Sequence, residues 1–406
     1  MANLKNLSLI CKQCGTSYPY RFQLHCTKEN CKGFIFPEFS TNNIHFQNKE
    51  NPLERFFDIL PIPSLEDAKY FGVQNTRLLH AKELGRKIGL DSLYIKCEGD
   101  YPTGTTKDRI NGANRAFLAS QGIESIACSS TGSNSSSLAE SIRQKPGLKA
   151  TFILGPEFLT RHHQSNDIAD VKLFLVDGNY EFSAKVAKNY AKSLGLKTDG
   201  RARNFAKRAA AGTAVLEAID QVGHTFDWFF QAVSSGMGLI SSYEMFQSYK
   251  DLGRIATIPR IVACEENSNA GMYSAWNEGS PIIREKDKIK NPNGLVKAIL
   301  RGDKTETYPE VYAACSASGG NISIASSIQI LLAQKLAQDY EGISMGEPSA
   351  LALASIIHMT DSGKIKQMEK VLLLSTGKYI PEEAPSYSFS VFPSQDFTPW
   401  GYPNFP

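Results

Sequence analysis

A chain of 406 residues with 44 basic and 41 acidic side chains has room for two or three domains and a formal net charge of only +3. With 42% hydrophobic and 21% charged residues, it has the composition of an ordinary globular protein, and no polybasic patch points to a nucleic-acid or membrane partner. The sequence lacks a signal-like apolar segment and any apolar run as long as a membrane span, so we expect a cytoplasmic protein.

Four of the eight cysteines stand near the N-terminus in two spaced pairs. Cys11 and Cys14 form a C-x2-C pair, and Cys26 and Cys31 form a C-x4-C pair. Thiolates at this spacing bind zinc tetrahedrally, and in the cytosol such a cluster favours a metal over disulfides. Residues 1–40 are therefore predicted to form a zinc-ribbon-like module, either with structural zinc bound or as a remnant that has lost its ion. The remaining cysteines lie in apolar runs and are expected to be reduced core residues: Cys97, Cys128, Cys264 and Cys315.

Short apolar runs alternate with helical periodicity over most of the remaining chain. We expect buried parallel strands at 93–97, 123–130, 148–155, 171–177, 228–235, 260–266 and 370–377. Helices are expected at 135–145, 182–195, 204–223, 322–340 and 348–363. This alternation predicts an α/β protein with helices covering a mostly parallel sheet and a ligand crevice at the carboxyl ends of the strands.

Three of these strands end in a cluster of glycine and serine directly before a helix. The clusters are SSTGSNSSS at 129–137, SSGMGLISS at 234–242 and STGK at 375–378. The backbone amides of such turns can hold an anion, although each cluster alone also fits ordinary turn chemistry. Their recurrence predicts a ligand with more than one anionic group. A nucleotide enzyme is disfavoured, because neither a complete G-x-G-x-x-G nor a G-x4-G-K-[ST] is present.

The stretch GDYPTGTTKDRING at 99–112 sets one lysine, Lys107, behind a small, hydroxyl-rich turn. A lysine at a strand end beside anion-binding turns either neutralises a phosphate or forms a Schiff base with a carbonyl. The densest basic segment, GRARNFAKRAAAG at 200–212, would suit a small anionic ligand. These residues alone leave both uses of the lysine open.

Five motifs follow one another in an order found in a known family. They are KCEGDYPTGTTKDR, CSSTGSNSSSLAE, QAVSSGMGLI, GEPSALALASI and LLLSTGK. They resemble the lysine segment, the S-T-G-N loop, the phosphate loop and two later segments of threonine synthases and their fold-type-II pyridoxal-phosphate relatives. DGRARNFAKRAAAGT and NAGMYSAWNEG are similar to the cysteate synthase branch, which joins phosphoserine with sulfite. The resemblance covers about residues 9–380.

This resemblance implies a tryptophan synthase beta-like fold with two open, mostly parallel sheets flanked by helices. It implies a large cofactor-binding domain at 41–110 and 215–380 and a smaller substrate-side domain at 111–214. The aromatic and proline-rich tail at 381–406 is expected to be an extended arm that packs on the body or on a second subunit. We expect a homodimer.

Carried over by position, the resemblance makes Lys107 the catalytic residue, which would hold pyridoxal phosphate as a Schiff base and later remove the substrate α-proton. The cofactor would be bound by Ser133, Asn134, Ser234, Ser235, Gly236, Met237, Gly238, Leu239, Ser375 and Thr376. The substrate would be bound by Thr105, Ser130, Thr131, Gly132, Arg203 and Arg208, with the two arginines on its phosphate. The serine loop also fits a helix cap, and the arginines also fit a solvated helix face.

The implied activity is that of a lyase or transferase of amino-acid biosynthesis that eliminates phosphate from an O-phospho amino acid and adds a small nucleophile. Cysteate synthase-like β-replacement on O-phosphoserine is the first interpretation. Threonine synthase activity on O-phosphohomoserine, or a related biosynthetic β-replacement, is the rival. A non-catalytic paralogue that binds the cofactor or another ligand is a hypothesis of a different class, motivated by Ser133, which replaces the family's asparagine.

Overall fold

Two open sheets and a small N-terminal sheet make up the β-structure. The computed structural model describes residues 4, 7–40, 44–66, 74–162, 168–381 and 391–392. The large sheet has six strands in the order β11-β10-β9-β12-β5-β4, parallel except for the β4–β5 pair at one edge. These strands are β4 (Leu78–His80), β5 (Ser92–Cys97), β9 (Trp228–Ala232), β10 (Arg260–Glu266), β11 (Asn321–Ala325) and β12 (Lys370–Ser375).

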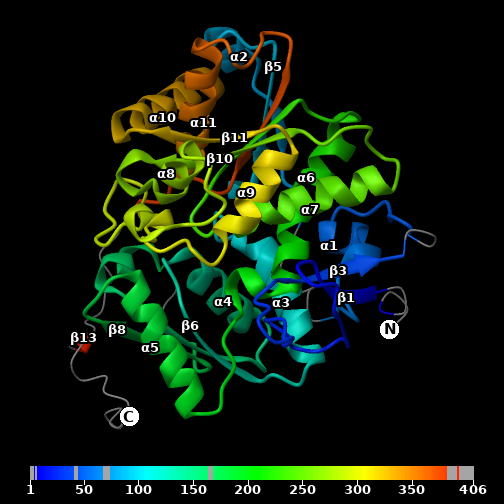
Figure 1. Ribbon diagram of the computed structural model, residues 1–406, viewed down its shortest axis with the longest axis vertical. Helices are drawn as coiled ribbons and strands as arrows, with labels where there is room; N and C mark the ends of the chain where they lie inside the picture. Colours follow the sequence, from blue (N-terminus) through cyan, green and yellow to red (C-terminus); the bar gives the residue numbers. More distant parts are fainter. Residues whose placement is uncertain are drawn as a thin grey trace.

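Helices cover both faces of the large sheet, which explains its apolar strands. In β12, every residue after Lys370 is buried, as expected for a strand with no solvent-facing side. Figure 1 shows α6 and α7 side by side on one side of the large sheet and α10 and α11 together on the other. The helices of this part are α1 (Pro52–Arg55), α2 (Lys82–Lys87), α6 (Phe205–Val222), α7 (Met237–Asp251), α8 (Gly271–Asn277), α9 (Tyr308–Ala317), α10 (Ser327–Glu341) and α11 (Glu347–Asp361).

The smaller sheet is entirely parallel and has the order β13-β8-β7-β6. Its strands are β6 (Ser125–Ser129), β7 (Lys149–Leu154), β8 (Val171–Val176) and β13 (Val391–Phe392). The helices of this region are α3 (Lys107–Ser120), α4 (Ser133–Gln144) and α5 (Tyr180–Ser193). Through β13, part of the C-terminal tail pairs with the body as an extended arm, and residues 382–390 and 393–406 lie outside the described residues.

The N-terminal module, residues 7–40, is a three-stranded antiparallel sheet beside α3 and α1 (Figure 1). Its strands are β1 (Leu7–Cys11), β2 (Ser17–Tyr18) and β3 (Ile35–Phe39). The rings of Tyr20 and Phe22 each lie 5.9 Å from the ring of Phe117 near the end of α3. The module is thus packed directly on the smaller part of the protein.

The expected α/β fold is confirmed, and all seven expected strands form. The helix expected at 322–340 is wrong at its start, because residues 321–325 form β11 and α10 begins only at Ser327. Ser326 and Gln329 form a reciprocal capping box that marks this boundary. Two expected domain boundaries, after residues 110 and 214, fall inside α3 and α6, and the division into domains stays a prediction.

Candidate active site

Lys107 is the first residue of α3, directly after the turn that leaves β5. Asp108 holds this turn, since its carboxylate accepts hydrogen bonds from Thr103 Oγ1 at 2.6 Å and Thr103 N at 2.9 Å. The turn is also tied to the end of β12, because Thr106 N donates to Thr376 O at 2.9 Å. The lysine is therefore fixed at the carboxyl edge of the large sheet, where β5 and β12 end together.

Behind this turn lies a group of four fully buried charges, the charge quartet: Lys96, Glu98, Arg109 and Glu217. Arg109 donates to Glu98 Oε1 at 2.8 Å and to Glu217 Oε2 at 2.9 Å, and Lys96 forms an ion pair with Glu217. Two cations and two carboxylates compensate each other, as buried charges require. Thr106 Oγ1 donates to Glu98 Oε2 at 3.0 Å, which joins the quartet to the residue before the lysine.

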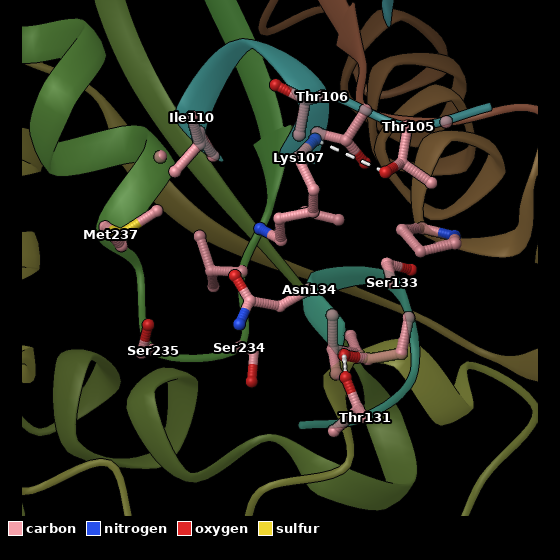
Figure 2. A pocket seen from close by; sticks show the side chains of 18 of the residues that line it. Thr105, Thr106, Lys107, Ile110, Thr131, Ser133, Asn134, Ser234, Ser235 and Met237 are labelled. Carbon is pink, nitrogen blue, oxygen red and sulfur yellow. Dashed lines mark hydrogen bonds between the residues drawn. The ribbon is translucent and has the colours of Figure 1, made fainter. Parts of the chain in front are cut away.

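A cavity of about 230 Å³ opens at this edge of the sheet. Figure 2 shows Lys107 pointing into it from the start of α3, with the loops after β6 and β9 on the opposite side. The predicted residues that line it are Thr105, Lys107, Ser130, Thr131, Ser133, Asn134, Ser234, Ser235, Gly236, Met237, Gly238 and Thr376. The predicted residues that do not line it are Gly132, Leu239, Ser375, Arg203 and Arg208. Loops far apart in the sequence thus meet in one site.

The environment of Lys107 lowers the pKa of its amine to about 8. Burial is the main cause, because the ammonium is poorly solvated, and the positive charge of Lys207 adds to it. The carboxylate of Asp199 acts in the opposite direction. The neutral amine is therefore well populated near pH 8, as a nucleophile and a base both require.

Lys207, Asp199 and Asn134 form a hydrogen-bonded cluster in the cavity wall. Lys207 Nζ donates to Asp199 Oδ2 at 2.5 Å and to Asn134 Oδ1 at 3.3 Å, and Asn134 Nδ2 donates to Asp199 Oδ2 at 3.3 Å. Burial acts to raise the pKa of Asp199, but Lys207 outweighs it and holds that pKa below its usual range. Both the oxygen and the nitrogen of the Asn134 amide are thus hydrogen-bonded within this cluster. Ser133 lies apart from Asn134 in the same loop (Figure 2).

The prediction that Arg203 and Arg208 bind the substrate phosphate is corrected by the structure. Arg203 Nε pairs with Glu306 Oε1 at 2.5 Å, and Arg208 is completely buried and donates to Ile35 O. Both side chains donate to backbone carbonyl groups of the N-terminal module, Arg203 to Lys32 O and Arg208 to Ile35 O. Neither guanidinium is available to a ligand in the cavity.

Four other cations line the cavity: Arg161, Arg201, Lys207 and Lys378. Arg161 Nε donates to Thr131 O at 3.1 Å, and one Arg201 nitrogen donates to Ser129 Oγ at 3.3 Å. Arg201 and Lys207 belong to the basic segment at 200–212 that the sequence indicated for an anionic ligand. No local pattern marks Arg161, which comes from the segment after β7.

The glycine-rich loop after β9 makes a tight turn into α7 that packs closely on the protein body. Gly236 caps α7 with φ 76°, and a Cβ there would lie 2.3 Å from Val311 Cγ2. The first N–H groups of α7 have no partner within the helix and form a site for an anion. Leu239 is fully buried behind this turn, so its side chain supports the loop from the protein core.

Gln231, at the end of β9, adds a buried polar group to this wall of the cavity. Its Oε1 has no hydrogen-bond partner among the described residues, and a Cβ on Gly238 would lie only 2.2 Å from its Nε2. A buried acceptor without a partner is costly unless a ligand donates to it. The glycine loop, the helix start and this amide together fit a phosphate-bearing ligand with polar groups.

The serine loop after β6 caps a helix and also lines the cavity. Ser130 Oγ accepts hydrogen bonds from Gly132 N at 3.0 Å and Ser135 N at 3.1 Å, so this hydroxyl does cap the turn into α4. Thr131 Oγ1 donates to Ala298 O at 3.1 Å. The side chain of Ser133 is therefore the hydroxyl of this loop best placed for a ligand (Figure 2).

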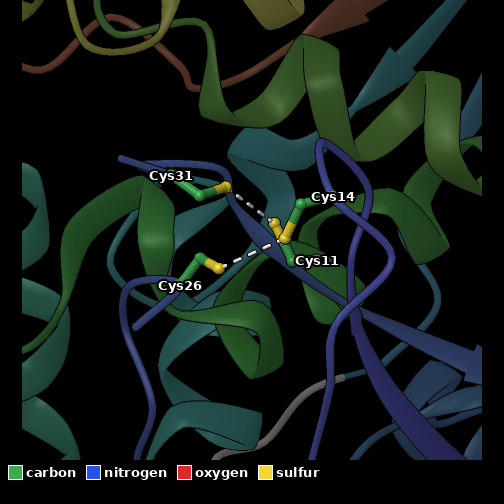
Figure 3. A group of neighbouring side chains, drawn as sticks. All are labelled: Cys11, Cys14, Cys26 and Cys31. Atoms are coloured by element: carbon green, nitrogen blue, oxygen red, sulfur yellow. Dashed lines mark hydrogen bonds between the residues drawn. The ribbon is translucent and has the colours of Figure 1, made fainter. Parts of the chain in front are cut away.

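The four N-terminal cysteines come together as predicted (Figure 3). Their Sγ atoms all lie within 4.8 Å of one another, with 3.6 Å between Cys11 and Cys31 and 3.5 Å between Cys14 and Cys26. Four thiolates around zinc, each at about 2.3 Å, lie at similar separations. Tyr18 OH donates to Cys26 Sγ at 2.9 Å, as outer-shell partners of a metal site do. The donor set fits structural zinc.

We expect the purified protein to contain about one zinc ion per chain, measured by atomic emission. The substitution Cys26→Ser is expected to remove most of this zinc and to lower the melting temperature, because a structural zinc contributes to folding. Cys128→Ser, which changes a buried cysteine outside the cluster, is the matched control and should retain the metal. A wild-type protein that is free of zinc after expression in zinc-supplemented medium would contradict this prediction.

Among the described residues, none of the helices combines the length and the apolar character needed to cross a lipid bilayer.

Comparison with known sequences gives matches along nearly the whole chain. A family model described as "Pyridoxal-phosphate dependent enzyme" matches residues 70–377. The cysteate synthase of Methanosarcina acetivorans is 26% identical over 386 residues, which is 91% of this chain and 91% of that protein. The threonine synthase of the same organism is 24% identical over 382 residues, which is 92% of each chain.

Solved structures match the fold at lower sequence identity. Maize serine racemase has a TM-score of 0.64 at 16% identity, with 78% of this chain and 94% of that chain covered. The processed form of threonine deaminase isoform 2 from Solanum lycopersicum has a TM-score of 0.62 at 16% identity, with 85% and 96% covered. These matches confirm the expected arrangement of two open sheets and their helices.

Proposed function

Because the chain belongs to the family of pyridoxal-phosphate dependent enzymes, we propose that it eliminates phosphate from an O-phospho amino acid and adds a small nucleophile. The version we favour is cysteate synthase-like β-replacement on O-phosphoserine, in line with the relatives of that name. The observation that carries the proposal is one cavity lined by Lys107, Lys207 and Arg201. One amine would serve the cofactor, and the other two cations would serve the substrate phosphate.

Different residues of the cavity would bind different parts of the cofactor. Lys107 Nζ would bind its aldehyde carbon, and the amides at the start of α7, with Gly236 at the cap, would bind its phosphate. Thr376 would present a hydroxyl to the pyridine nitrogen, which favours elimination and replacement over transamination, and Ser375 would support it from behind. When bound, pyridoxal phosphate supplies an electron sink for the negative charge that develops at the substrate Cα.

The chain's own groups would then handle the substrate. The amides of the serine loop would bind the α-carboxylate, with Thr105 on the opposite side, and the hydroxyl of Ser133 would face the cofactor. Lys107 would take the proton from Cα and return it to Cα at the end of the reaction. Between these steps the Cβ–O bond breaks, its electron pair leaves with the phosphate, and the nucleophile supplies the electron pair of the new bond to Cβ. Lys207 would stabilise the departing charge.

Threonine synthase activity on O-phosphohomoserine is the second candidate, because relatives of that name also match nearly the full chain. The two activities differ in whether the phosphate leaves the β or the γ carbon. A homodimer and a cytoplasmic location stay predictions from the sequence.

Phosphate release from O-phosphoserine, O-phosphothreonine and O-phosphohomoserine, with and without sulfite, tests the proposal. We expect release from O-phosphoserine and, with sulfite present, formation of cysteate. Release from O-phosphohomoserine alone would exclude the β-replacement version in favour of threonine synthase activity. Cofactor binding without release from any of the three would favour the non-catalytic paralogue.

The lowered pKa of Lys107 gives a pH prediction for the apo protein. Only the neutral amine attacks an aldehyde, so the rate of cofactor capture should rise with pH and level off above about 8. An ordinary lysine, with a pKa of about 10.4, would keep rising beyond that pH. Absorbance of the bound cofactor after mixing measures this rate at each pH.

Lys207→Met should move the midpoint of this pH profile upward, because it removes a positive neighbour that lowers the pKa of Lys107. Lys335→Met, which changes an exposed surface lysine, should leave the midpoint in place. A wild-type midpoint at the ordinary lysine value would contradict the prediction.

A further inference from the structure

Residues 199–208 form a segment with two functional faces. Asp199, Arg201 and Lys207 line the cavity. Arg203 and Arg208, from the same short segment, reach in the opposite direction and bind the N-terminal module. A few residues of backbone therefore join two of the cavity cations, Arg201 and Lys207, to the residues that bind the cysteine-bearing module.

The contacts on the module side are close and buried. Arg203 donates to Lys32 O at 3.0 Å, and its guanidinium lies 4.5 Å from the ring centre of Phe34. Arg208 donates to Ile35 O and lies 5.3 Å from the same ring. Hydrogen bonds from a buried guanidinium to carbonyl groups and its stacking on an aromatic ring fix position as well as adding stability. Arg208 also lies 4.7 Å from the ring centre of Phe36, so the module holds the two arginines through its backbone and two aromatic rings.

The backbone between the two faces adopts a conformation that needs support. Gly200 and Arg201 have φ values of 75° and 47°, and Arg201 is one of two non-glycine residues with positive φ among the described residues. Such a conformation is unfavourable for a non-glycine residue and persists only where the surroundings impose it. A Cβ on Gly200 would lie 2.5 Å from Leu24 Cδ2, so the module closes directly over this turn.

We propose that the N-terminal module is a positioning element for the substrate-binding cations. By binding Arg203 and Arg208 from outside, it holds Arg201 and Lys207 in the cavity, where they meet the second anionic group of the substrate. Arg203 and Arg208 are positioning residues, and neither touches the reacting atoms. The identity of the anionic group as a phosphate rests on the proposed function.

Loss of this positioning should weaken the binding of the substrate's anionic group more than the binding of the cofactor. Lys107 and the glycine loop belong to other elements, α3 and the start of α7. The module also packs on α3, through Phe22 and Phe117, ten positions beyond the lysine. Its rings Phe34 and Phe36 pack with Met237 at the start of α7, whereas the arginines donate to the module's backbone and not to the glycine loop. Weakening the contact of Arg203 with the module should therefore change the affinity for a phosphorylated ligand much more than the affinity for the cofactor.

Arg203→Met tests this in the cofactor-loaded protein by calorimetric titration with O-phospho-L-serine and with L-serine. We expect O-phospho-L-serine to bind about tenfold more weakly than to wild type, with less than about a threefold change for L-serine and an unchanged cofactor absorbance. Phe34→Leu leaves every charge in place and should also weaken the binding of O-phospho-L-serine. It replaces Arg203→Met in this test if that variant folds poorly.

Arg260→Met is the matched control. Arg260 also pairs with a glutamate, Glu369, and also stacks on an aromatic ring, Trp228 at 4.0 Å, but it lies at the opposite end of the strands. Its loss should leave both affinities unchanged. An equal loss for both ligands in Arg203→Met and Phe34→Leu, or no loss for either, would overturn the proposal.

Hydrogen–deuterium exchange of residues 199–204 separates this inference from the proposed function. Exchange should be faster in Arg203→Met and in Phe34→Leu than in wild type, and unchanged in Arg260→Met. If wild type does not prefer O-phospho-L-serine to L-serine, the proposed substrate class is wrong, and the exchange rates alone decide whether the module holds the segment. Unchanged exchange in both variants would refute the positioning role even if the substrate class is right.

Discussion

Lys107→Ala is expected to lower phosphate release from the substrate by about 10³-fold or more, because the same amine holds the cofactor and moves the α-proton. The cofactor can still enter the glycine loop, but it should no longer become attached to the chain. Borohydride treatment of the loaded wild type, followed by peptide mapping, should place a pyridoxyl group on Lys107. The variant should carry none after the same treatment.

Lys335→Met is the matched control for this prediction, because it removes a lysine that is 71% exposed and paired only with Asp339 on the surface of α10. It should keep full activity and the labelled peptide. Wild-type protein that binds cofactor but carries the borohydride label on another lysine would show that the assignment of Lys107 is wrong.

Glu217→Gln is expected to lower the free energy of unfolding by about 3–5 kcal/mol, measured by urea denaturation. Lys96 and Arg109 would then share the single carboxylate of Glu98 in a fully buried space. The expected loss of stability is large because one buried positive charge is left uncompensated. The loss of a single hydrogen bond would cost far less. The variant should also bind cofactor more slowly, because the quartet supports the turn before the lysine through Thr106.

Asp339→Asn provides the comparison for the quartet. It breaks an exposed ion pair with Lys335 and should change the free energy of unfolding by less than about 1 kcal/mol. The double variant Lys96→Met with Glu217→Gln removes one charge of each sign and should lose less than the sum of its single variants. Additive losses would mean that the four charges do not act as one unit.

Most of the large sheet could be predicted from the sequence because its central strands are covered on two sides. The run VLLL inside β12 is apolar for this reason. The strand β11 was not predicted, since its five residues, NISIA, are followed at once by the long helical pattern of α10. The capping pair Ser326 and Gln329 was the local signal for that boundary.

The loops of the candidate site could be predicted because parallel strands bring their carboxyl ends to one edge. The side chains that would bind an anion could not be predicted from the sequence. Arg201 and Arg203 stand two positions apart, and which of them faces the cavity depends on the left-handed turn at 200–201. Arg161 reaches the cavity from a separate segment, so only the tertiary structure places it beside Thr131.

The strand β13 gives the smaller sheet an outermost strand from the far end of the chain. Val391 pairs with Leu175 and Phe392 with Val176, so the backbone of β8 is partly covered at these positions. Without this cover, β8 would offer unsatisfied amide and carbonyl groups to any extended peptide, including the same edge of another molecule. The strand β13 thus hinders aggregation through this edge. Its removal would first lower the solubility of the protein.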